Sequence, residues 1–507
     1  MPSSAFDDLV KKAALALRSG HASVARELVA RVGPVADLAS SALLVRGLAD
    51  IALEDWAAAE EVFTLASARE PDNGSFFFNR GLAEENLKKN EAAEASFERA
   101  LALGFERGAA LGNLSNIYRK RGRYEDAVTA AREALEAGAP RVDALNNLGL
   151  ALGRLMRFAE AETAFEEAVA LAPKNPFFWA NRANLAADRR DFESSFRFFA
   201  VARALHDDPS IRRDEAMARL VTGDAAGWEL YESRLEIPKA FHAPVHCKRW
   251  AGEDLQGKTL LLLSEQGMGD VLHFCRYGAS FAALGASLIW MVPQPLVRLL
   301  EGQLPGRVIS RAEDFPPAAF YLPLLSAPFA LKAFQARKSG AYLTALPHRP
   351  SLSVEGAELK IGLVWTGSAT HERDKERSVP LSSFAPLWKA FPDAQFFAPF
   401  VGRGLDEIAA LRAPVADLSD SIRDFADTAS FLAQMDLLIS VDTAAAHLAG
   451  AMGVPCFLLL PYVPDWRWGL EGKTTDWYAS LRLFRRGAGD DWAAVVERIV
   501  AEIRSLR

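Results

Sequence analysis

The pattern of hydrophobic and polar positions changes character once along this chain, near Lys258. Before that point, apolar and small residues recur at helical spacing, and a less regular connector comes after them. Beyond it, short apolar runs bounded by glycine and proline alternate with helical segments, which is typical of parallel α/β sheets. The pattern predicts an α-helical array (residues 1–210), a connector (211–257) and an α/β region of two halves (258–350 and 351–507).

The helical array repeats with a period of 34 residues. Small residues recur at Ala25, Ala59, Ala93, Ala127, Ala161 and Ser195, and a second series runs Phe63, Phe97, Ala131, Phe165 and Phe199. A third series marks the close-packing position in the first helix of each unit: Gly47, Gly81, Ser115, Gly149 and Ala183. The pattern resembles the tetratricopeptide repeat, a helix-turn-helix solenoid, with about five well-formed units and an imperfect one before Ala25 as a cap.

A column of asparagines points to function within this array. Asn79, Asn113, Asn147 and Asn181 fall at the same place in four successive units, at a position that faces the concave groove in this repeat family. Asparagine offers a donor and an acceptor, so such a column suits the backbone of an extended peptide. The arrangement is similar to the asparagine ladder of the O-GlcNAc transferase superhelix. The alternative is that these side chains bond to neighbouring repeats or to water.

The connector carries aromatic residues and two histidines. We expect a helix over Trp228–Leu235 and interpret Trp228, Tyr231 and Trp250 as hydrophobic anchors that dock the solenoid on the α/β region. His242 and His246 have metal-like spacing, but Pro244 between them prevents a helix from setting that geometry, so we expect no metal site.

The first α/β half opens with a strand and a glycine-containing turn. Thr259–Ser264 reads as a buried strand, and Glu265–Asp270 (EQGMGD) leads into a helix over Val271–Ala283. Gly267 and Gly269 let the backbone approach a ligand closely, and Asp270 lies at the helix start. The remaining predicted elements of this half are strands at Ser287–Val292, Arg307–Ser310 and Phe320–Leu322, and a helix at Pro295–Leu304.

The second half opens with a strand at Leu359–Trp365 and a polar loop with Arg373, Lys375 and Arg377. A cationic loop after a parallel strand is suited to neutralising a diphosphate or phosphodiester leaving group, although a solvated surface loop is the commoner meaning of such charge runs. Further predicted elements are helices at Ser382–Ala390, Gly404–Arg412, Asp424–Gln434 and Asp491–Leu506, and a strand at Gln395–Phe400.

The stretch Asp436–Gly469 contains the strongest site signal. A buried strand (Leu437–Val441) leads through Asp442 and Thr443 into a helix that ends at Met452, and a second strand comes next (Cys456–Leu460). The N–H groups at the start of this helix attract phosphate. His447 lies four residues after Thr443, on the same helix face, and could donate to the same anion. The alternative is an ordinary α/β turn with a partly buried histidine.

Charge, cysteine content and hydropathy limit the partners and the compartment that we expect. The 507 residues carry a net charge of −7 without a basic stripe, which excludes a typical nucleic-acid-binding surface. Cys247, Cys275 and Cys456 are far apart and read as buried thiols in a reducing compartment. No apolar run approaches the length of a membrane helix, so we expect a cytoplasmic protein without membrane insertion.

Two consecutive Rossmann-like halves, each with a loop aimed at a central cleft, suggest the GT-B glycosyltransferase architecture after the α-solenoid. Specific motifs carry this resemblance: W-E-x-Y-E-x-R, E-Q-G-x-G-D-x-L-x-F-x-R-Y, R-S-x-P-L, S-V-D-T-A-x-A-H-L-A-G-A-x-G-x-P, P-D-W-R-W, D-W-Y-x-S and L-F-R-R. The chain resembles bacterial proteins that fuse tetratricopeptide repeats to a heptosyltransferase-like domain. Within them it is similar to flagellin glycosyltransferases, which attach a nonulosonic acid.

This resemblance implies roles for individual residues. Asp270 matches the catalytic base, and its place at a helix N-terminus would keep it ionised. Thr443, Ala444 and His447 match the donor-phosphate contacts, and Lys375 or Arg377 would steady the departing nucleotide. Asp465 and Trp466 would line the donor pocket. Gln266, Gly267, Gly269 and Asp442 complete the expected donor-binding set.

We therefore expect an inverting, metal-independent protein O-glycosyltransferase that needs no cofactor, uses a nucleotide sugar such as a CMP-nonulosonate and modifies flagellin held in the groove of the repeats. The first α/β half is short, which leaves room for the repeats to supply the acceptor. Two alternatives stay open: a heptosyltransferase-like enzyme acting on a lipopolysaccharide or glycan, and a non-catalytic adaptor that binds a nucleotide sugar.

Overall fold

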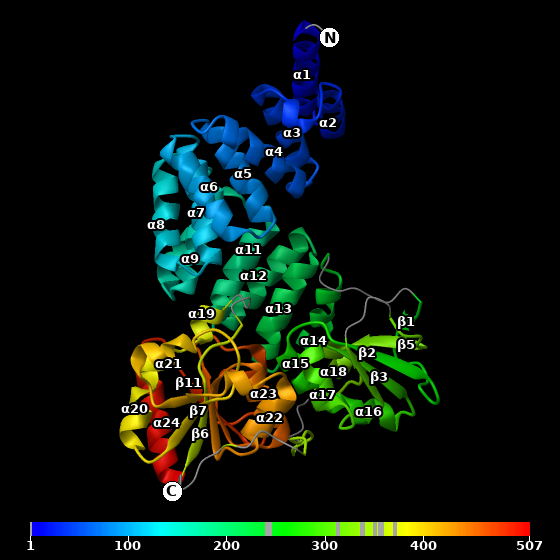
Figure 1. Cartoon of the computed structure of the whole chain (residues 1–507), viewed down its shortest axis with the longest axis vertical. Coiled ribbons are helices and arrows are strands. Elements are labelled where there is room, and N and C mark those ends of the chain that lie inside the picture. Colours follow the sequence, from blue (N-terminus) through cyan, green and yellow to red (C-terminus); the bar gives the residue numbers. More distant parts are fainter. Residues whose placement is uncertain are drawn as a thin grey trace. The chain divides into compact units, whose positions relative to one another are not determined.

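A computed structural model describes residues 3–238, 246–310, 315–334, 340–347, 352, 359–368 and 373–506 of the chain. They fall into two compact units, Met1–His206 and Asp207–Arg507 (Figure 1). The first unit contains helices only and the second contains two sheets. His242, with the rest of residues 239–245, lies outside the described residues.

The first unit is a stack of antiparallel helix pairs in which each helix contacts the next along the chain. A short 3₁₀ turn, η1 (Val35–Asp37), comes after the first pair. The helices are α1 (Ser3–Arg18), α2 (Ala22–Ala30), α3 (Ser40–Ala52), α4 (Trp56–Arg69), α5 (Gly74–Asn86), α6 (Asn90–Ala102), α7 (Arg107–Lys120), α8 (Tyr124–Glu136), α9 (Arg141–Arg154), α10 (Phe158–Leu171), α11 (Pro176–Asp188) and α12 (Phe192–Leu205).

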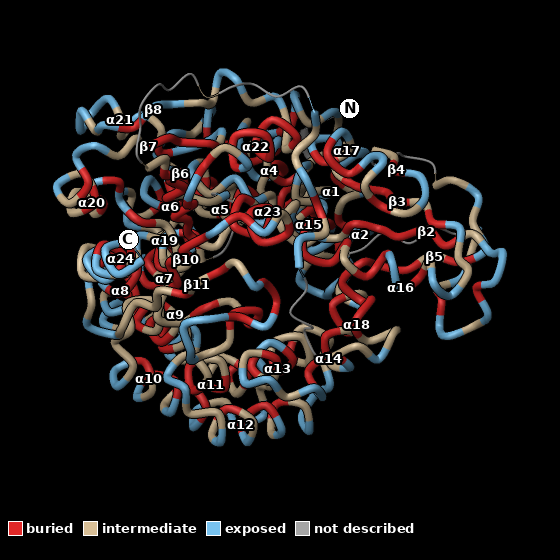
Figure 2. Tube along the Cα trace, turned by 90° about the horizontal axis from the view of Figure 1, so that it is seen from below, coloured by how far each residue is buried: buried red, intermediate tan, exposed pale blue. Residues whose placement is uncertain are grey.

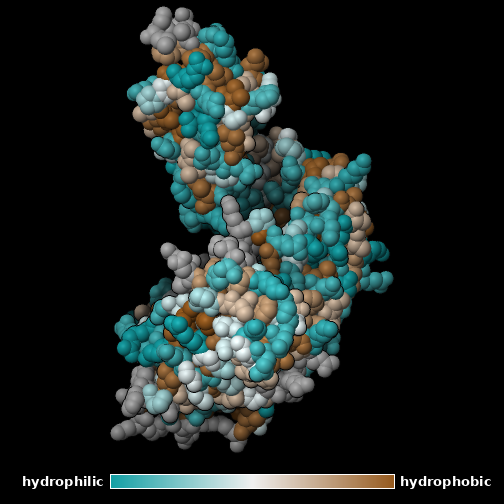
Figure 3. All heavy atoms as spheres, turned by 90° about the vertical axis from the view of Figure 1, so that its right-hand side faces the viewer, coloured by the Kyte–Doolittle hydropathy of each residue, from teal (hydrophilic) through white to brown (hydrophobic). Residues whose placement is uncertain are grey.

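The predicted small residues lie where the two helices of a pair come closest. A Cβ built on Gly47 would lie 2.5 Å from the ring of Phe63, so only glycine permits this approach. The same contact recurs between Gly81 and Phe97 and between Gly149 and Phe165. The 34-residue pattern is thereby confirmed as the packing pattern of the helix pairs. Their surface is largely hydrophilic with scattered hydrophobic residues on the face seen in Figure 3.

The second unit begins with two helices and a 3₁₀ turn, α13 (Pro209–Val221), α14 (Ala226–Tyr231) and η2 (Glu232–Leu235), before a fully parallel sheet in the order β1-β5-β2-β3-β4. Its strands are β1 (Lys248–Arg249), β2 (Thr259–Leu263), β3 (Ser287–Val292), β4 (Arg307–Ser310) and β5 (Phe320–Pro323). Its helical elements are α15 (Met268–Phe274), η3 (Cys275–Tyr277), α16 (Gly278–Ala283), α17 (Gln294–Leu300), η4 (Leu324–Ser326) and α18 (Ala327–Ala330).

The single helix predicted over Val271–Ala283 is wrong. A 3₁₀ turn separates α15 from α16, and Gly278 at the start of α16 packs so tightly on Trp290 that a Cβ would lie 2.4 Å from the indole. The change of helix type accompanies this close packing on β3.

The second sheet is also fully parallel, in the order β11-β10-β9-β6-β7-β8. Its strands are β6 (Lys360–Val364), β7 (Gln395–Ala398), β8 (Val415–Asp417), β9 (Leu437–Val441), β10 (Cys456–Leu460) and β11 (Leu481–Arg485). Its helical elements are α19 (Asp374–Arg377), η5 (Leu381–Phe384), α20 (Ala385–Ala390), α21 (Asp406–Leu411), η6 (Ser419–Ser421), α22 (Phe425–Leu432), α23 (Ala444–Met452), η7 (Trp466–Trp468) and α24 (Trp492–Leu506). The prediction of two Rossmann-like halves is confirmed.

One hydrophobic core runs through both halves of the second unit. It contains Leu260 and Leu262 of β2 together with Leu438 of β9 and Leu458 of β10. Alternate residues of β9, such as Leu437 and Ile439, face a second cluster beneath α24. Figure 2 shows buried residues concentrated along β2, β3 and α23. The shared core fixes the two sheets against each other at the junction where the site lies.

Candidate functional site

The candidate site lies where α15 of the first half meets α23 of the second. Each helix comes after the carboxyl end of a parallel strand, β2 or β9, which is the usual ligand edge of such sheets. A Cβ built on Gly269 would lie 3.0 Å from Cδ2 of His447 and 3.4 Å from Cα of Ala444. The absence of a side chain at Gly269 therefore lets the two helix starts approach, and three predicted donor-site residues come together.

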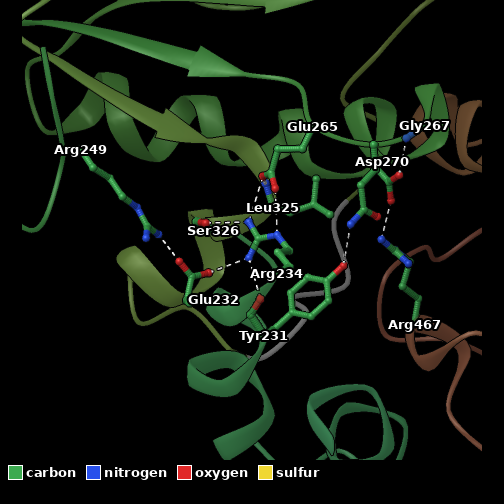
Figure 4. Close-up of polar contacts among 11 residues, drawn as sticks. Tyr231, Glu232, Arg234, Arg249, Glu265, Gly267, Asp270, Leu325, Ser326 and Arg467 are labelled. Atoms are coloured by element: carbon green, nitrogen blue, oxygen red, sulfur yellow. Dashed lines mark hydrogen bonds and ion pairs between the residues drawn. The ribbon is translucent and has the colours of Figure 1, made fainter. Parts of the chain in front are cut away.

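Asp270 is joined to the second half by Arg467. Its Oδ1 accepts a hydrogen bond from Nη2 of Arg467, and its Oδ2 accepts one from the N–H of Gly267 at 2.9 Å (Figure 4). Nη1 of Arg467 donates to Oδ1 of Asp465 at 2.8 Å. Arg467 is only 7% exposed, so it is a buried cation between two carboxylates. Sequence reasoning missed Arg467, although a basic residue between two tryptophans in P-D-W-R-W was an available signal.

The surroundings of Asp270 act on its pKa in opposite directions. Burial raises the pKa of this carboxyl above its ordinary value, and the positive charge of Arg467 opposes the shift. The helix start alone predicts an ionised Asp270; the structure adds Arg467 as a nearby cation that favours the same form. A carboxylate with a raised pKa is a stronger proton acceptor than an exposed one.

The connector motif W-E-x-Y-E-x-R holds the glycine turn in place. The buried guanidinium of Arg234 donates to both carboxylate oxygens of Glu265, at 2.8 and 2.9 Å, and to Oγ of Ser326 at 2.7 Å (Figure 4). Nε2 of Gln266 donates to the hydroxyl of Tyr231 at 3.1 Å. The turn that carries Asp270 is thus anchored by side chains from η2 and α14.

The aromatic residues predicted as anchors belong to the core of the second unit. Trp228 and Tyr231 pack edge-on against Trp466, with ring centroids 5.1 and 6.1 Å apart. Trp250 packs edge-on against Phe281 at 5.6 Å. The predicted donor-pocket residue Trp466 is therefore a buried side chain that supports the turn beside it.

The turn before α23 brings a carboxylate and a guanidinium to the helix start. Oγ1 of Thr443 lies 3.1 Å from Oγ of Ser440, and Nη1 of Arg377 donates to the carbonyl of Asp442 at 2.7 Å. Burial, together with the negative charge of Asp465, raises the pKa of Asp442 to about 6. The first N–H groups of α23 have no acceptor within the helix, as at every helix start.

Within the predicted cationic loop, Arg377 and Lys375 differ. Arg377 is 13% exposed and is held by Asp374, whose Oδ1 accepts from Nε at 3.2 Å. Lys375 is exposed on α19 and does not share the hydrogen bond to Asp442. Residues 369–372 of the loop lie outside the described part. Of the two candidates, Arg377 reaches the turn before α23.

His447 is buried and shares a tyrosine hydroxyl with a second histidine. Nδ1 of His447 lies 2.9 Å from Oη of Tyr478, and Nδ1 of His273 lies 2.8 Å from the same oxygen. The ring of His447 stacks on Trp468 at 5.2 Å. Burial, with the charge of Arg467, lowers the pKa of His447 to about 3, so this imidazole is neutral at physiological pH. Sequence reasoning missed His273 and Tyr478, because they lie 205 residues apart and no local pattern indicates that they are in contact.

Arg485, from the L-F-R-R motif, fixes the turn that carries Arg467. Its guanidinium donates to the carbonyls of Trp468, Gly469, Glu471 and Gly472 at distances of 2.6 to 3.1 Å. Asp465 begins this turn by accepting from the N–H of Arg467 at 3.0 Å.

The asparagine column makes mostly internal hydrogen bonds. Nδ2 of Asn79 donates to the carbonyl of Ser75 at 2.8 Å, Nδ2 of Asn147 to the carbonyl of Gly112 at 3.1 Å, and Nδ2 of Asn181 to Oδ1 of Asn146 at 2.8 Å. Asn113 is half-buried and its side chain has no hydrogen-bond partner in the described part of the chain. Bonding to neighbouring repeats, noted as the alternative, therefore applies to Asn147 and Asn181, and the peptide groove stays a prediction.

The described residues contain no group of three or more His, Cys, Asp and Glu side chains that could hold a metal ion. His246 instead hydrogen-bonds to the carbonyl of Pro316 at 3.0 Å. Among the helices of the described ranges, none has both the length and the hydrophobicity to span a membrane.

Comparisons with known proteins agree with this architecture. The tetratricopeptide-repeat family matches residues 44–105 and 113–176. Protein FlbA of Caulobacter vibrioides is 27% identical over 386 residues, and the match covers 67% of this chain but only 63% of FlbA, less than two thirds of its length.

Two similar solved structures are a tetratricopeptide repeat protein from Parabacteroides merdae and PilF from Pseudomonas aeruginosa. The first is 17% identical with a TM-score of 0.38, over 46% of this chain and 93% of that one. The second is 18% identical with a TM-score of 0.33, over 40% and 93%. From its sequence matches and its own sheets, the chain is a tetratricopeptide-repeat protein with a C-terminal α/β region, distantly related to FlbA.

Proposed function

We propose that the chain is a protein O-glycosyltransferase whose second unit works as a GT-B transferase on a nucleotide sugar. One observation carries the proposal: the largely buried carboxylate of Asp270, 16% exposed, lies beside the start of α23, where Ala444 and His447 approach Gly269. A proton acceptor from one parallel sheet and an anion-attracting helix start from the other are the two components that glycosyl transfer needs. The similarity to FlbA is compatible with this activity and does not identify it.

In this mechanism Asp270 accepts the proton of a Ser or Thr hydroxyl while the hydroxyl oxygen attacks the anomeric carbon. The bond from that carbon to the phosphate oxygen breaks, and the nucleotide leaves with the electron pair towards Thr443, Ala444 and His447. One-step displacement inverts the configuration at the anomeric carbon. Because Arg467 also pairs with Asp465, it keeps a counter-charge when Asp270 becomes neutral.

The donor side relies on fixed donors and cations. Arg377 lies at the turn before α23, and the neutral His447 adds a hydrogen-bond donor, so the departing phosphate meets positive and polar groups. A CMP-nonulosonate is the donor that the motif resemblance favours. The same resemblance favours flagellin as the acceptor, bound by the repeats through positions such as Asn113.

The test is intact-mass analysis of flagellin co-expressed with this protein and a pathway that makes nonulosonic acid. Wild type is expected to add the mass of the sugar, and Asp270→Asn to lower the rate by about 10²–10⁴-fold through loss of the base. Asp424→Asn is the matched control, because Asp424 belongs to a different ion pair between the halves, with Arg298 at 2.6 Å, which does not involve Asp270. Undiminished modification by Asp270→Asn would exclude the base assignment.

A second candidate is an adaptor that binds a nucleotide sugar without turning it over. The ion pair between Asp270 and Arg467 favours it, because a paired carboxylate is a weaker proton acceptor. The internal hydrogen bonds of Asn147 and Asn181 favour, in turn, an acceptor other than a peptide, such as a lipopolysaccharide sugar. Stabilisation by a nucleotide sugar without any product identifies the adaptor, and modification of a glycan but not of flagellin identifies the other enzyme.

A further inference from the structure

Two histidines from different halves share one tyrosine hydroxyl in the core of the second unit. Nδ1 of His273 and Nδ1 of His447 lie 2.8 and 2.9 Å from Oη of Tyr478. All three side chains are buried, and burial lowers the pKa of both imidazoles, so both rings are neutral. Each ring therefore has one N–H and one bare nitrogen, and the single hydroxyl hydrogen of Tyr478 couples their tautomers.

Asp442 selects the tautomer of His447. Nε2 of His447 lies 3.9 Å from Oδ1 of Asp442. An ionised carboxylate only accepts hydrogen bonds, so it attracts an N–H at Nε2 and repels a bare nitrogen there. The proton of His447 consequently belongs on Nε2, and its Nδ1 must accept the hydroxyl hydrogen of Tyr478.

The tautomer of His273 follows from the hydrogen bond that Tyr478 donates to His447. Because Tyr478 donates its hydrogen to His447, its oxygen must accept from Nδ1–H of His273. Nε2 of His273 is then bare, in agreement with its burial without a hydrogen-bond partner among the described residues, where an N–H would be an unsatisfied donor. Two other groups lie at Tyr478. Arg276 lies against its ring at 4.6 Å, but a guanidinium only donates and cannot take this hydrogen. Tyr342 hydrogen-bonds to the Tyr478 hydroxyl and donates its own hydrogen to the carbonyl of Leu272 at 2.7 Å; if it took the Tyr478 hydrogen, the bare Nδ1 of His447 would face an oxygen lone pair.

We propose that His273 and Tyr478 are positioning residues that hold His447 as a neutral Nε2–H donor for a phosphate oxygen of the nucleotide donor. The phosphate role rests on the proposed function, whereas the tautomers rest on the hydrogen-bond geometry and on the neutrality of the two buried rings. Above the pKa of Asp442, about 6, this carboxyl is ionised and favours the Nε2–H tautomer of His447. The imidazole itself stays neutral and adds a hydrogen-bond donor without a charge change of its own.

The tautomers are read by long-range proton–nitrogen NMR of the full chain labelled with ¹⁵N-histidine. The chain has eight histidines, so His447→Gln and His273→Asn assign the two signals. We expect a protonated Nε2 in His447 and a protonated Nδ1 in His273. In Tyr478→Phe, His447 is expected to become a mixture of both tautomers. Tyr277→Phe is the control, because its hydroxyl donates to the carbonyl of Ala333 at 3.4 Å and not to an imidazole. A protonated Nδ1 in wild-type His447 overturns the proposal.

The functional arm measures the dissociation constant of the nucleotide sugar. Tyr478→Phe is expected to weaken binding about tenfold, the effect of one lost well-oriented hydrogen bond, and Tyr277→Phe to leave it unchanged. Equal affinities of the two variants overturn the phosphate role. The wild-type spectrum decides the tautomers even if a variant fails to fold. If the protein shows the expected tautomers but transfers no sugar, the proposed function is refuted and the positioning role of His273 and Tyr478 still holds.

Discussion

Replacing Arg467 by methionine tests the buried ion pair that joins the two halves. The substitution keeps an apolar stem but leaves Asp270 and Asp465, 16% and 26% exposed, without their cation. Removing one partner of a buried pair costs about 3–5 kcal/mol, so we expect a loss of that size in the free energy of unfolding at pH 8.

The cost should depend on pH. Arg467 holds the pKa of Asp465 below its usual value and opposes the rise for Asp270, so both pKa values rise when it is removed. Carboxyl groups whose folded pKa exceeds the unfolded one stabilise the fold when protonated and lose that contribution as pH rises through the folded pKa. We therefore expect the loss to be about 1–2 kcal/mol smaller at pH 5 than at pH 8.

Urea unfolding followed by tryptophan fluorescence measures this loss, because all of the eleven tryptophans except Trp56 and Trp179 lie in the second unit. Arg298→Met is the matched control: it breaks the ion pairs of Arg298 with Asp424 and Asp427, which also join the halves. Arg298 is 43% exposed and Asp427 keeps a second cation in Arg423, so we expect a cost of only about 1 kcal/mol. Equal costs for the two variants, or a cost for Arg467→Met that does not change with pH, would refute the reasoning.

Single contacts give three further predictions. Gly269→Ala should destabilise the second unit by about 1–3 kcal/mol through overpacking, and it should weaken donor binding. Gly267→Ala should lower the free energy of unfolding in urea clearly less, because its Cβ would lie 3.5 Å from the nearest atom. Asp442→Asn should become stabilising relative to wild type as pH rises from about 4.5 to 7.5. The raised pKa of about 6 means that ionising this carboxyl in the fold lowers the stability of wild type by about 3 kcal/mol, a cost that the amide avoids. A stability difference that does not change with pH would contradict this. Asn113→Ala should weaken flagellin binding by about 2–10-fold without changing the free energy of unfolding. Asn147→Ala should also lower the free energy of unfolding, because it loses the hydrogen bond to the carbonyl of Gly112. Unchanged flagellin binding by Asn113→Ala would argue against the peptide groove.

The fold was largely readable from the sequence because its patterns are local. The strands at Leu437–Val441 and Cys456–Leu460 are confirmed to the residue, since both are fully buried, mostly apolar runs with sharp ends: Asp436 and Asp442 flank the first, and the stop at Gly453 precedes the second. Gly453 adopts a φ of 72°, as its role in ending α23 requires. β8 was missed because only Val415 of its three residues is buried, and β11 because arginines interrupt its apolar pattern.

The geometry of the candidate site could be predicted from the sequence only where its residues lie at the ends of predicted strands. Asp270 and the Thr443–His447 turn stand at strand ends, where sequence position implies a ligand edge. Arg467 and Tyr478 act through partners some 200 residues away in the chain, at separations of 197 and 205, and no local pattern encodes such a meeting. The hydrogen bonds of Asn147 and Asn181 within the repeats could not be predicted either. A 34-residue spacing shows that these side chains lie on the same face of successive helices, but it does not show which group each amide bonds to.

The hydrophobic core shared by the two α/β halves has a consequence for engineering and for descent. A chimaera that exchanged only the second α/β half would cut across the packing of Leu260 and Leu262 with Leu438 and Leu458, and it would need a matching hydrophobic interior in the new half. The helix pairs of the first unit have apolar clusters of their own, so the exchangeable boundary of this chain is His206–Asp207. If the proposed function holds, new acceptor specificities would be gained most readily by recombination at that boundary, with the α/β unit inherited whole.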